Sequence, residues 1–489
     1  MSAVLADDSP PGRRLPRQVV KPPGLRRVLA ETYRDLRNDP ADRDARLALA
    51  ELLLHTDRRD LAPRHLRRLA RNVKLGWGGA PRLGKLLFRI GDFESARRLL
   101  GACLERGLID DDAMRTLSAI TYRMGDRQAA KRHLAAAGWL RPINTPGRIE
   151  ADRPTILRLR SFVGSRCGVK RNKETGLFSH WLKNGHFSVK HFFPDKDYNH
   201  LIANFAGENV GLVSDLPAFD LAINSVSCPD LMARPLGDIA RFLERFPKTP
   251  VINPPEKVLE TTRAKNYARL NPIPGIRFPQ TLQVRNDAEP GEVRGRIEAA
   301  GIAYPMILRR VGTQTGKTMA LIASATEAEA YIAALAPGVE IYAIRYLDCR
   351  GADGLHHKIR CFFIDGVFYP VACLSNDVWQ IHSGDRYRVM STNPATQEAE
   401  RAYLSDPAAY LGERVFTALH EIAKIIDLDF FGIDFAPDGD GGAIVFEANA
   451  AMRHNYDHAE TFPYTKPHLD RVSDAMGRMV ADRAARSKP

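Results

Sequence analysis

Phe431-Gly432-Ile433-Asp434-Phe435 and Phe446-Glu447-Ala448-Asn449, the two segments that decide the fold, flank a turn rich in glycine and aspartate. Both have the length and apolar content of neighbouring strands. Side chains alternate along a strand, so Glu447 and Asn449 share one face, and Asp434 lies on the strand beside them. Acids and an amide inside apolar strands are costly to bury unless a cation or donors meet them. Their oxygens suit Mg²⁺ that also holds substrate phosphates. The alternative is a strand pair with ordinary polar edge residues.

A glycine-rich loop precedes this pair in the sequence, within Arg309-Arg310-Val311-Gly312-Thr313-Gln314-Thr315-Gly316-Lys317-Thr318. The ending Gly316-Lys317-Thr318 resembles a Walker A loop, but Val311 stands where that motif needs its first glycine. The residues after the loop predict a strand, whereas a Walker A loop leads into a helix. A glycine loop between two strands can instead close over phosphates, with backbone N–H groups and Lys317 as donors.

The rest of residues 276–480 predicts an α+β domain, because apolar stretches of strand length alternate with helical patterns and Asp365-Gly366 favours a hairpin turn. Strands are predicted at 304–309, 318–323, 340–346, 357–364, 367–373, 431–436 and 443–448, and helices at 287–300, 325–335, 411–425 and 468–485. Upstream, strands at 154–159, 219–224 and 250–253 and a helix at 239–246 predict a smaller α/β unit with parallel strands. A helix at 256–270 follows it.

In this order, the strand–glycine loop–strand, the hairpin at 357–373 and the closing acid pair resemble the ATP-grasp superfamily. The segment 251–281 is similar to the linker that leads into the family's nucleotide domain. The resemblance covers residues 154–480 and implies that ATP lies between two α+β subdomains with two Mg²⁺ ions. It also implies that a carboxylate is phosphorylated to an acyl phosphate, which an amine or another nucleophile then attacks.

The resemblance also implies roles for individual positions. Phosphate contacts fall on Arg309, where the family usually has lysine, on Gly312, Gly316 and Lys317 of the loop, and on Arg263 or Lys265 upstream. The strand containing Tyr342 and Ile344 would offer backbone groups to adenine, and Arg360 would lie near the reacting carboxylate and γ-phosphate. Asp434, Glu447 and Asn449 match the metal positions, and Lys358, His382 and Arg453 are candidate substrate contacts. Catalysis would rest on Arg309, Lys317 and Arg360, because phosphoryl transfer depends on positioning and charge neutralisation.

An internal repeat with a period of 34 residues covers residues 41–142. Small residues recur where two helices would approach closely, and large apolar residues recur where they would fill the space between them. The recurring positions are Ala62, Ala96 and Ala130; Leu66, Leu100 and Leu134; Ala50, Gly84 and Ser118; and Leu54, Phe88 and Tyr122. This pattern resembles the tetratricopeptide repeat. It implies a helical stack with a concave peptide- or protein-binding surface, or alternatively a structural support for the remainder.

Charge separates the two parts of the chain. Residues 1–150 hold 30 Lys and Arg against 18 Asp and Glu, so they carry nearly all of the net charge of +13. This asymmetry predicts an acidic partner, although a solvated arginine-rich surface explains it equally well. The basic part has no stacking aromatic residues among its arginines, which disfavours nucleic acid. The absence of a membrane span or a signal peptide, and six scattered cysteines, predict a cytoplasmic protein.

Together these patterns predict a multidomain chain: a flexible basic arm (1–23), an all-α helical repeat (24–145), an α/β pre-ATP-grasp domain (154–252) and an α+β ATP-grasp domain (253–485). The predicted function is that of an ATP- and Mg²⁺-dependent ligase that joins a carboxylate to an amine or other nucleophile. Its repeat domain would recruit a peptide or protein. Two alternatives remain, a small-molecule kinase of the same fold and a non-catalytic repeat-protein scaffold.

Overall fold

The computed structural model describes residues 24–73, 75–183, 187–189, 191–193, 195–207, 211, 213, 216–313, 316 and 318–486. The predicted arm and Lys317 therefore lie outside the described residues. By its contacts the chain forms two compact units. Unit 1 comprises Met1–Gly125 and Gly168–Trp181, and unit 2 comprises Asp126–Cys167 and Leu182–Pro489.

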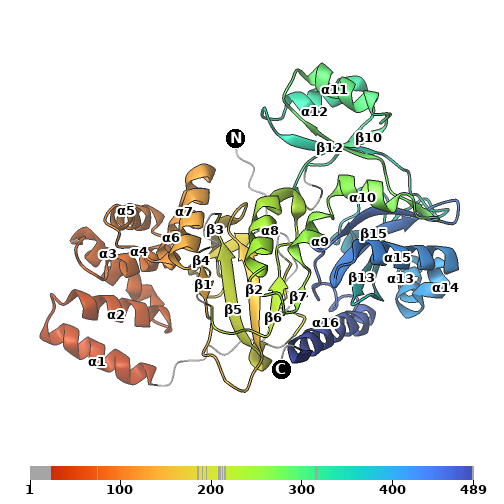
Figure 1. The fold of residues 1–489 in the computed structure, drawn as a ribbon. Helices are drawn as coiled ribbons and strands as arrows, with labels where there is room; N and C mark the ends of the chain where they lie inside the picture. Colours follow the sequence, from red (N-terminus) through yellow and green to blue (C-terminus); the bar gives the residue numbers. More distant parts are fainter. Residues whose placement is uncertain are drawn as a thin grey trace. The chain divides into compact units, whose positions relative to one another are not determined.

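Unit 1 is built on helices, and those that begin at Arg43, Phe93 and Asp111 each follow an aspartate that caps them. Gly91, with φ of 86°, turns the chain between two of these helices, and the side chain of Asp92 accepts a hydrogen bond from the backbone N–H of Ser95 to cap the second. The helices are α1 (Leu25–Asn38), α2 (Arg43–Leu54), α3 (Ala62–Arg71), α4 (Ala80–Arg89), α5 (Phe93–Leu104) and α6 (Asp111–Arg123), with a short 3₁₀ turn at Arg59–Leu61 (Figure 1).

The small residues of the 34-residue period lie at close helix contacts. A Cβ atom added to Gly84 in α4 would lie 2.6 Å from the side chain of Leu100 in α5, so a larger residue would separate the helices. Ala62, Leu66 and Ala96, which repeat at the same period, are fully buried. These positions pack as the period predicts. The tetratricopeptide assignment itself stays a prediction.

A two-stranded hairpin also contributes to unit 1. It consists of β3 (Arg166–Arg171) and β4 (Phe178–Lys183), and neither strand was predicted from the sequence. The ring of Phe178 lies edge-on to the ring of Phe93, with centroids 5.0 Å apart. Unit 1 is therefore closed by a segment distant from it in sequence.

Unit 2 begins with α7 (Arg127–Leu140) and a five-stranded sheet in the order β1-β5-β2-β6-β7. Four of its strands run parallel, of which three were predicted, and β1 is antiparallel to β5. The strands are β1 (Ile143–Asn144), β2 (Thr155–Ser161), β5 (Asn199–Phe205), β6 (Leu221–Asn224) and β7 (Val251–Ile252), with a 3₁₀ turn at Asp195–Asp197 and helix α8 (Pro229–Leu243). The predicted helix at 256–270 is two helices, α9 (Pro255–Leu259) and α10 (Arg263–Leu270), because Thr262 caps a new helix by accepting from the backbone N–H of Lys265.

An antiparallel four-stranded sheet follows in the order β11-β10-β12-β9. Helices α11 and α12 lie against it in Figure 1, and they share a core with its strands through residues such as Ile297, Leu308 and Ile332. The elements are β9 (Thr281–Arg285), α11 (Pro290–Ala299), β10 (Met306–Arg310), β11 (Ala320–Ile322), α12 (Ala325–Ala333) and β12 (Glu340–Arg345).

The last sheet has the order β14-β13-β15-β16-β8 and is antiparallel except for the pair β16–β8. Its strands are β8 (Ile276–Arg277), β13 (His356–Ile364), β14 (Val367–Asn376), β15 (Phe430–Pro437) and β16 (Ala443–Asn449). The helical elements beside it are a π-helical turn (Arg386–Met390), α13 (Pro394–Ser405), α14 (Pro407–Leu411), α15 (Glu413–Ile426), a 3₁₀ turn (Pro463–Thr465) and α16 (Lys466–Arg486). Every strand predicted in 304–448 is present within three residues of its predicted ends.

Two further observations concern the whole chain. All six cysteines are free thiols, and five of them are buried, as their scattered positions predicted. None of the described helices is long and apolar enough to cross a membrane.

Candidate active site

A cavity of about 650 Å³ lies in unit 2 between the two antiparallel sheets. Side chains from β10, β13, β14 and β16 and from the loops that follow them form its walls. Most of the predicted site residues line it: Arg263, Arg309, Gly316, Ile344, Lys358, Arg360, His382, Asp434, Glu447, Asn449 and Arg453. The structure thus brings together residues that are almost two hundred positions apart in the chain.

The two acids face each other across neighbouring strands. Asp434 of β15 pairs in register with Glu447 of β16, and a β-bulge follows Asp434. Both carboxylate oxygens of Asp434 accept hydrogen bonds from the Arg360 guanidinium, each at 2.7 Å. Burial opposes ionisation of Asp434, but Arg360 and then Lys358 outweigh it and hold its pKa below the usual range. Asp434 is therefore an ionised carboxylate inside the cavity.

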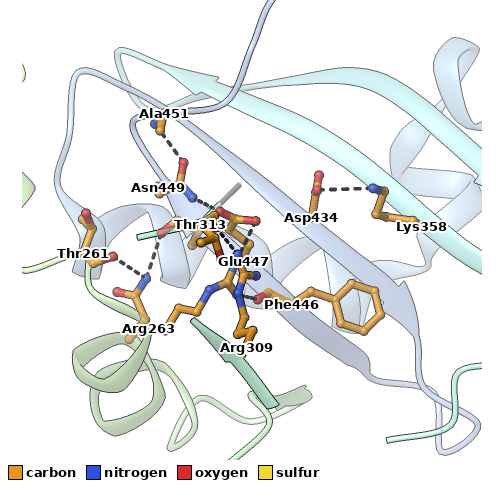
Figure 2. A network of polar contacts seen from close by, with 12 residues as sticks. Thr261, Arg263, Arg309, Thr313, Lys358, Asp434, Phe446, Glu447, Asn449 and Ala451 are labelled. Carbon is orange, nitrogen blue, oxygen red and sulfur yellow. Dashed lines mark hydrogen bonds and ion pairs between the residues drawn. The ribbon is translucent and has the colours of Figure 1, made fainter. Parts of the chain in front are cut away.

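Glu447 is held by a second arginine. Arg263 of α10 donates to the carbonyl of Phe446 at 2.6 Å and pairs with the Glu447 carboxylate at 2.9 Å. Figure 2 shows this pair together with Asn449, whose amide donates to the other oxygen of Glu447. The Asn449 oxygen accepts from the backbone N–H of Ala451 at 2.8 Å. The three proposed metal ligands are thus fixed from both sides.

Their chemistry fits Mg²⁺. Asp434, Glu447 and Asn449 offer hard oxygen donors to one cavity from two adjacent strands. Within the described residues no group of three or more His, Cys, Asp or Glu side chains is arranged to hold a metal. An ion here would take two carboxylates and an amide from the protein and fill its shell with phosphate oxygens and water, which is the usual Mg²⁺ arrangement.

Arg309 of β10 is a buried cation within electrostatic reach of Glu447. It is only 8% exposed, and its guanidinium donates to the carbonyl of Thr313 at the start of the glycine loop. Burial, and then the charge of Arg263, lowers the pKa of Arg309 to about 10. Two neighbouring buried arginines repel each other, so anionic groups in the cavity would relieve an unfavourable charge.

The glycine loop takes conformations that favour glycine. Gly312 and Gly316 have φ of 70° and 66°. A Cβ atom on Gly312 would collide with the side chain of Leu231 in α8, and one on Gly316 would lie 2.6 Å from His382. His382 therefore borders the loop at the cavity, and its backbone N–H donates to Asp385 at 2.5 Å.

The main cavity is not lined by three of the predicted nucleotide contacts, Lys265, Tyr342 and Gly312. Lys265 is half-exposed, pairs with Glu260 at 2.8 Å and does not line the cavity, since it projects from α10 on another side than Arg263. Tyr342 lies in the interior of its sheet, where β12 pairs with both β10 and β9, so its backbone groups are engaged in strand pairing. Its hydroxyl donates to Asp230 of α8 at 2.7 Å beside a second, much smaller cavity of about 50 Å³.

Several residues at the cavity were missed by sequence reasoning. Arg386 and His458 line it, and the fully buried Glu400 pairs with Arg386 from behind. Asp230 borders the smaller cavity, and burial raises its pKa although Tyr342 donates to it. Glu400 gave no signal in the sequence, because its helix α13 also contains other polar and charged residues, among them Glu398 and Arg401.

No family model and no curated protein matches the chain. Among solved structures it is similar to the D-alanine–D-alanine ligase of Bacillus anthracis complexed with ATP, with 14% identity, a TM-score of 0.40 and coverage of 68% of this chain and 99% of that one. A RimK domain ATP-grasp protein of Sphaerobacter thermophilus is 15% identical, with a TM-score of 0.39 and coverage of 67% of this chain and 99% of that one. The VanG D-Ala:D-Ser ligase of Enterococcus faecalis is 11% identical, with a TM-score of 0.40 and coverage of 68% of this chain and 100% of that one. These values are too low to carry an argument about activity.

Proposed function

We propose that the chain is an ADP-forming ligase of the ATP-grasp type, which uses Mg²⁺ and ATP to activate a carboxylate for attack by an amine or another nucleophile. One observation carries this proposal. Two acidic strand residues, Asp434 and Glu447, face each other in register, and three arginines surround them in a single cavity beside a glycine loop. Paired carboxylates for a metal beside cations for phosphate are what phosphoryl transfer requires.

The basic side chains of the site would bind the anionic groups of the substrates, and the acidic ones would bind the metal. Arg263 and Arg309 would hold the β- and γ-phosphates, since both line the cavity next to Glu447. Mg²⁺ on Asp434, Glu447 and Asn449 would neutralise phosphate charge and orient the transferred group. Arg360, fixed by Asp434, would face the carboxylate that attacks.

The reaction then consists of two displacements. A carboxylate oxygen of the substrate forms a bond to the γ-phosphorus, and the bond to the β-phosphate oxygen breaks, which releases ADP. The nucleophile next forms a bond to the acyl carbon, loses a proton, and expels inorganic phosphate. The glycine loop with Gly316 and His382 would exclude water from the acyl phosphate between the two steps.

The adenine contacts belong after strand β12 in this proposal. Arg345, Tyr346 and Leu347 line the cavity at the end of the strand, where the backbone leaves the sheet. Ile307 and Phe446 line it with apolar surface on which a base can pack. This replaces the expectation that Tyr342 supplies the backbone groups.

We further propose that unit 1 recruits an acidic peptide or protein. The support is electrostatic. Burial, and then Arg46, Arg64 and Arg68, lowers the pKa of His65 on α3, which places four basic groups close together. None of Arg46, Arg64 and Arg68 has an ion pair in the described part of the chain. An acidic partner would supply the missing charge.

Product analysis tests the ligase proposal. Full-length protein is incubated with Mg²⁺, ATP and pooled acids and amines, and nucleotides and phosphate are quantified. We expect ADP and phosphate in equal amounts, only when acid and nucleophile are both present. AMP and pyrophosphate would identify an adenylating enzyme, and a stable phosphorylated product without phosphate release would identify a kinase.

A variant pair tests the metal assignment in the same assay. Glu447→Gln keeps size but removes a charged ligand, so turnover should fall by about a hundredfold or more. Glu421→Gln, which removes an exposed carboxylate of α15 paired with Lys424, is the matched control and should leave turnover unchanged. Near-normal turnover in Glu447→Gln would overturn the metal assignment.

A further inference from the structure

The end of the cavity near the π-helical turn Arg386–Met390 carries basic groups that phosphoryl transfer does not use. Arg386 lines the cavity and is 4% exposed. One of its terminal nitrogens donates to Glu400, but its Nε is buried without a hydrogen-bond partner in the described structure. An arginine has five N–H donors, so this group retains unsatisfied donor capacity at the cavity.

Glu400 cannot satisfy Arg386 further, because its own oxygens are already engaged. The backbone N–H of Cys373 donates to one oxygen at 3.0 Å, and the Tyr464 hydroxyl donates to the other at 2.8 Å. Glu400 is completely buried behind Arg386 and fixes its position. A buried arginine whose position is fixed by an ion pair on one side can bind a ligand on the other, although the same ion pair also occurs as a purely structural one.

Two more basic side chains lie at this end on the loop after β16, and one of them, Arg453, pairs with Asp457 at 3.0 Å. His458 and Arg453 both line the cavity, and the Nδ1 of His458 is buried without a partner. Burial, and then Arg386, lowers the pKa of His458, with Arg453 acting in the same direction and Asp457 opposing it. The loop and the turn are in contact, since the Tyr387 ring lies 4.9 Å from the His458 ring.

Lys358 contacts both the acid pair and the loop before the π-helical turn. Its Nζ lies 3.9 Å from Asp434 and donates to the carbonyl of Ile381 at 2.5 Å. Arg386, Arg453 and His458 line the same cavity as the acid pair.

We propose that Arg386, His458 and Arg453 form a subsite that binds a second, non-reacting carboxylate of the ligase's substrates. This inference rests on the proposed function and specifies its substrate class. The planar guanidinium of Arg386 can donate two parallel hydrogen bonds to one carboxylate. The Nε of Arg386 and the Nδ1 of His458, which have no hydrogen-bond partner in the described structure, would each gain one from the bound carboxyl group. The carboxylate belongs either to the activated acid or to the nucleophile.

Thermal unfolding of the full chain with Mg²⁺ and a non-hydrolysable ATP analogue tests the subsite. Glutarate is compared with butyrate for the acid, and 4-aminobutyrate with butylamine for the nucleophile. We expect the carboxylate-bearing probe of at least one pair to bind about tenfold or more tightly than its counterpart, the effect of a hydrogen bond to a charged group. The pair that shows the difference identifies which substrate carries the carboxylate.

Variants then assign the difference to these residues. The double substitution Arg453→Gln with His458→Gln should abolish the preference, as should Arg386→Lys, which keeps a charge beside Glu400. Arg388→Gln, two residues along the same turn, removes an exposed arginine paired with Asp377 and should preserve it. No preference in the wild type, or a preference that survives in the double variant, overturns the subsite. Stabilisation by the ATP analogue alone reports on the nucleotide site separately.

Discussion

His454 is a buried histidine on the loop after β16 that is held neutral. It is 4% exposed, its ring is stacked on that of Phe192 with centroids 5.2 Å apart, and its Nε2 lies 2.9 Å from the hydroxyl of Ser473. Burial, and then His191, lowers the pKa of His454 to about 4. Protonation therefore competes with folding at this residue.

The pH dependence of stability follows from this shift. The ordinary histidine pKa of 6.5 in the unfolded chain exceeds the folded value, so the unfolded chain binds more protons between pH 6.5 and about 4. His454 should therefore cost about 3 kcal/mol of stability as the pH falls across this range. Urea unfolding at several pH values should show a flatter profile for His454→Gln than for wild type. The exposed control His55→Gln should follow the wild-type profile, and equal profiles for all three proteins would refute the prediction.

The sequence allowed some site residues to be placed and not others, for a physical reason. Glu447 and Asn449 lie two residues apart on one strand, and strand alternation alone predicts their common face. Asp434 lies on the preceding strand, which a short turn joins to theirs. Arg386 and His458 meet only because the loop after β16 packs against a turn from a different part of the chain. Asp230 is likewise brought to Tyr342 by a contact between helix α8 and strand β12. Such contacts depend on packing that no local pattern encodes.

Among the structural elements, the glycine loop offers the clearest test. Gly312→Ala places a side chain where φ is 70° and where Leu231 already fills the space. Left-handed backbone costs an alanine about 1–2 kcal/mol, so the ATP analogue should bind roughly tenfold more weakly. Gly439→Ala, in the open turn before β16 with nothing within 4 Å, is the matched control. Calorimetry measures both, and unchanged affinity in Gly312→Ala would remove the loop from the nucleotide site.

Strands with strong alternation or a tight turn were predictable, and strands without such signals were not. The hairpin β13–β14 was predicted because Asp365-Gly366 specifies its turn, with both residues at positive φ. Strand β5 was missed although it is central to its sheet, because Asn199 and His200 at its start disguise the apolar run that follows. The hairpin β3–β4 was missed because it is polar along one edge and buries only a few rings.

Across the whole molecule, charge is concentrated in unit 1, and this predicts salt-sensitive binding of acidic chains. Fluorescence anisotropy of labelled poly-L-glutamate should report binding to the full-length protein that weakens as salt rises, because exposed charges are screened over about 8 Å at physiological ionic strength. The pair Arg64→Glu and Arg68→Glu on α3 should abolish this binding. Reversal of Arg471 and Arg478 on α16 is the matched control. If the α3 variant binds as wild type does, the charge of unit 1 is only a solvated surface.

The division of the chain also determines which truncation can be interpreted. A protein beginning near Ala151 would lack α7, which belongs to unit 2, and would retain Phe178, whose ring packs against Phe93 of unit 1. Such a protein would expose the apolar surface of unit 2 that α7 covers, and also the ring of Phe178 that Phe93 covers. Charge reversal on the intact chain avoids this difficulty.

The hairpin β3–β4 also has a consequence for biosynthesis. Unit 1 is complete only when residues 168–181 have left the ribosome, and by then residues 126–167 of unit 2 have already been made. The nascent helices must therefore wait with the surface around Gly91 and Phe93 uncovered while a segment of another folding unit passes them. Slow translation before residue 168 would prolong that exposure, and a chaperone that recognises aromatic surface would find its substrate in this interval.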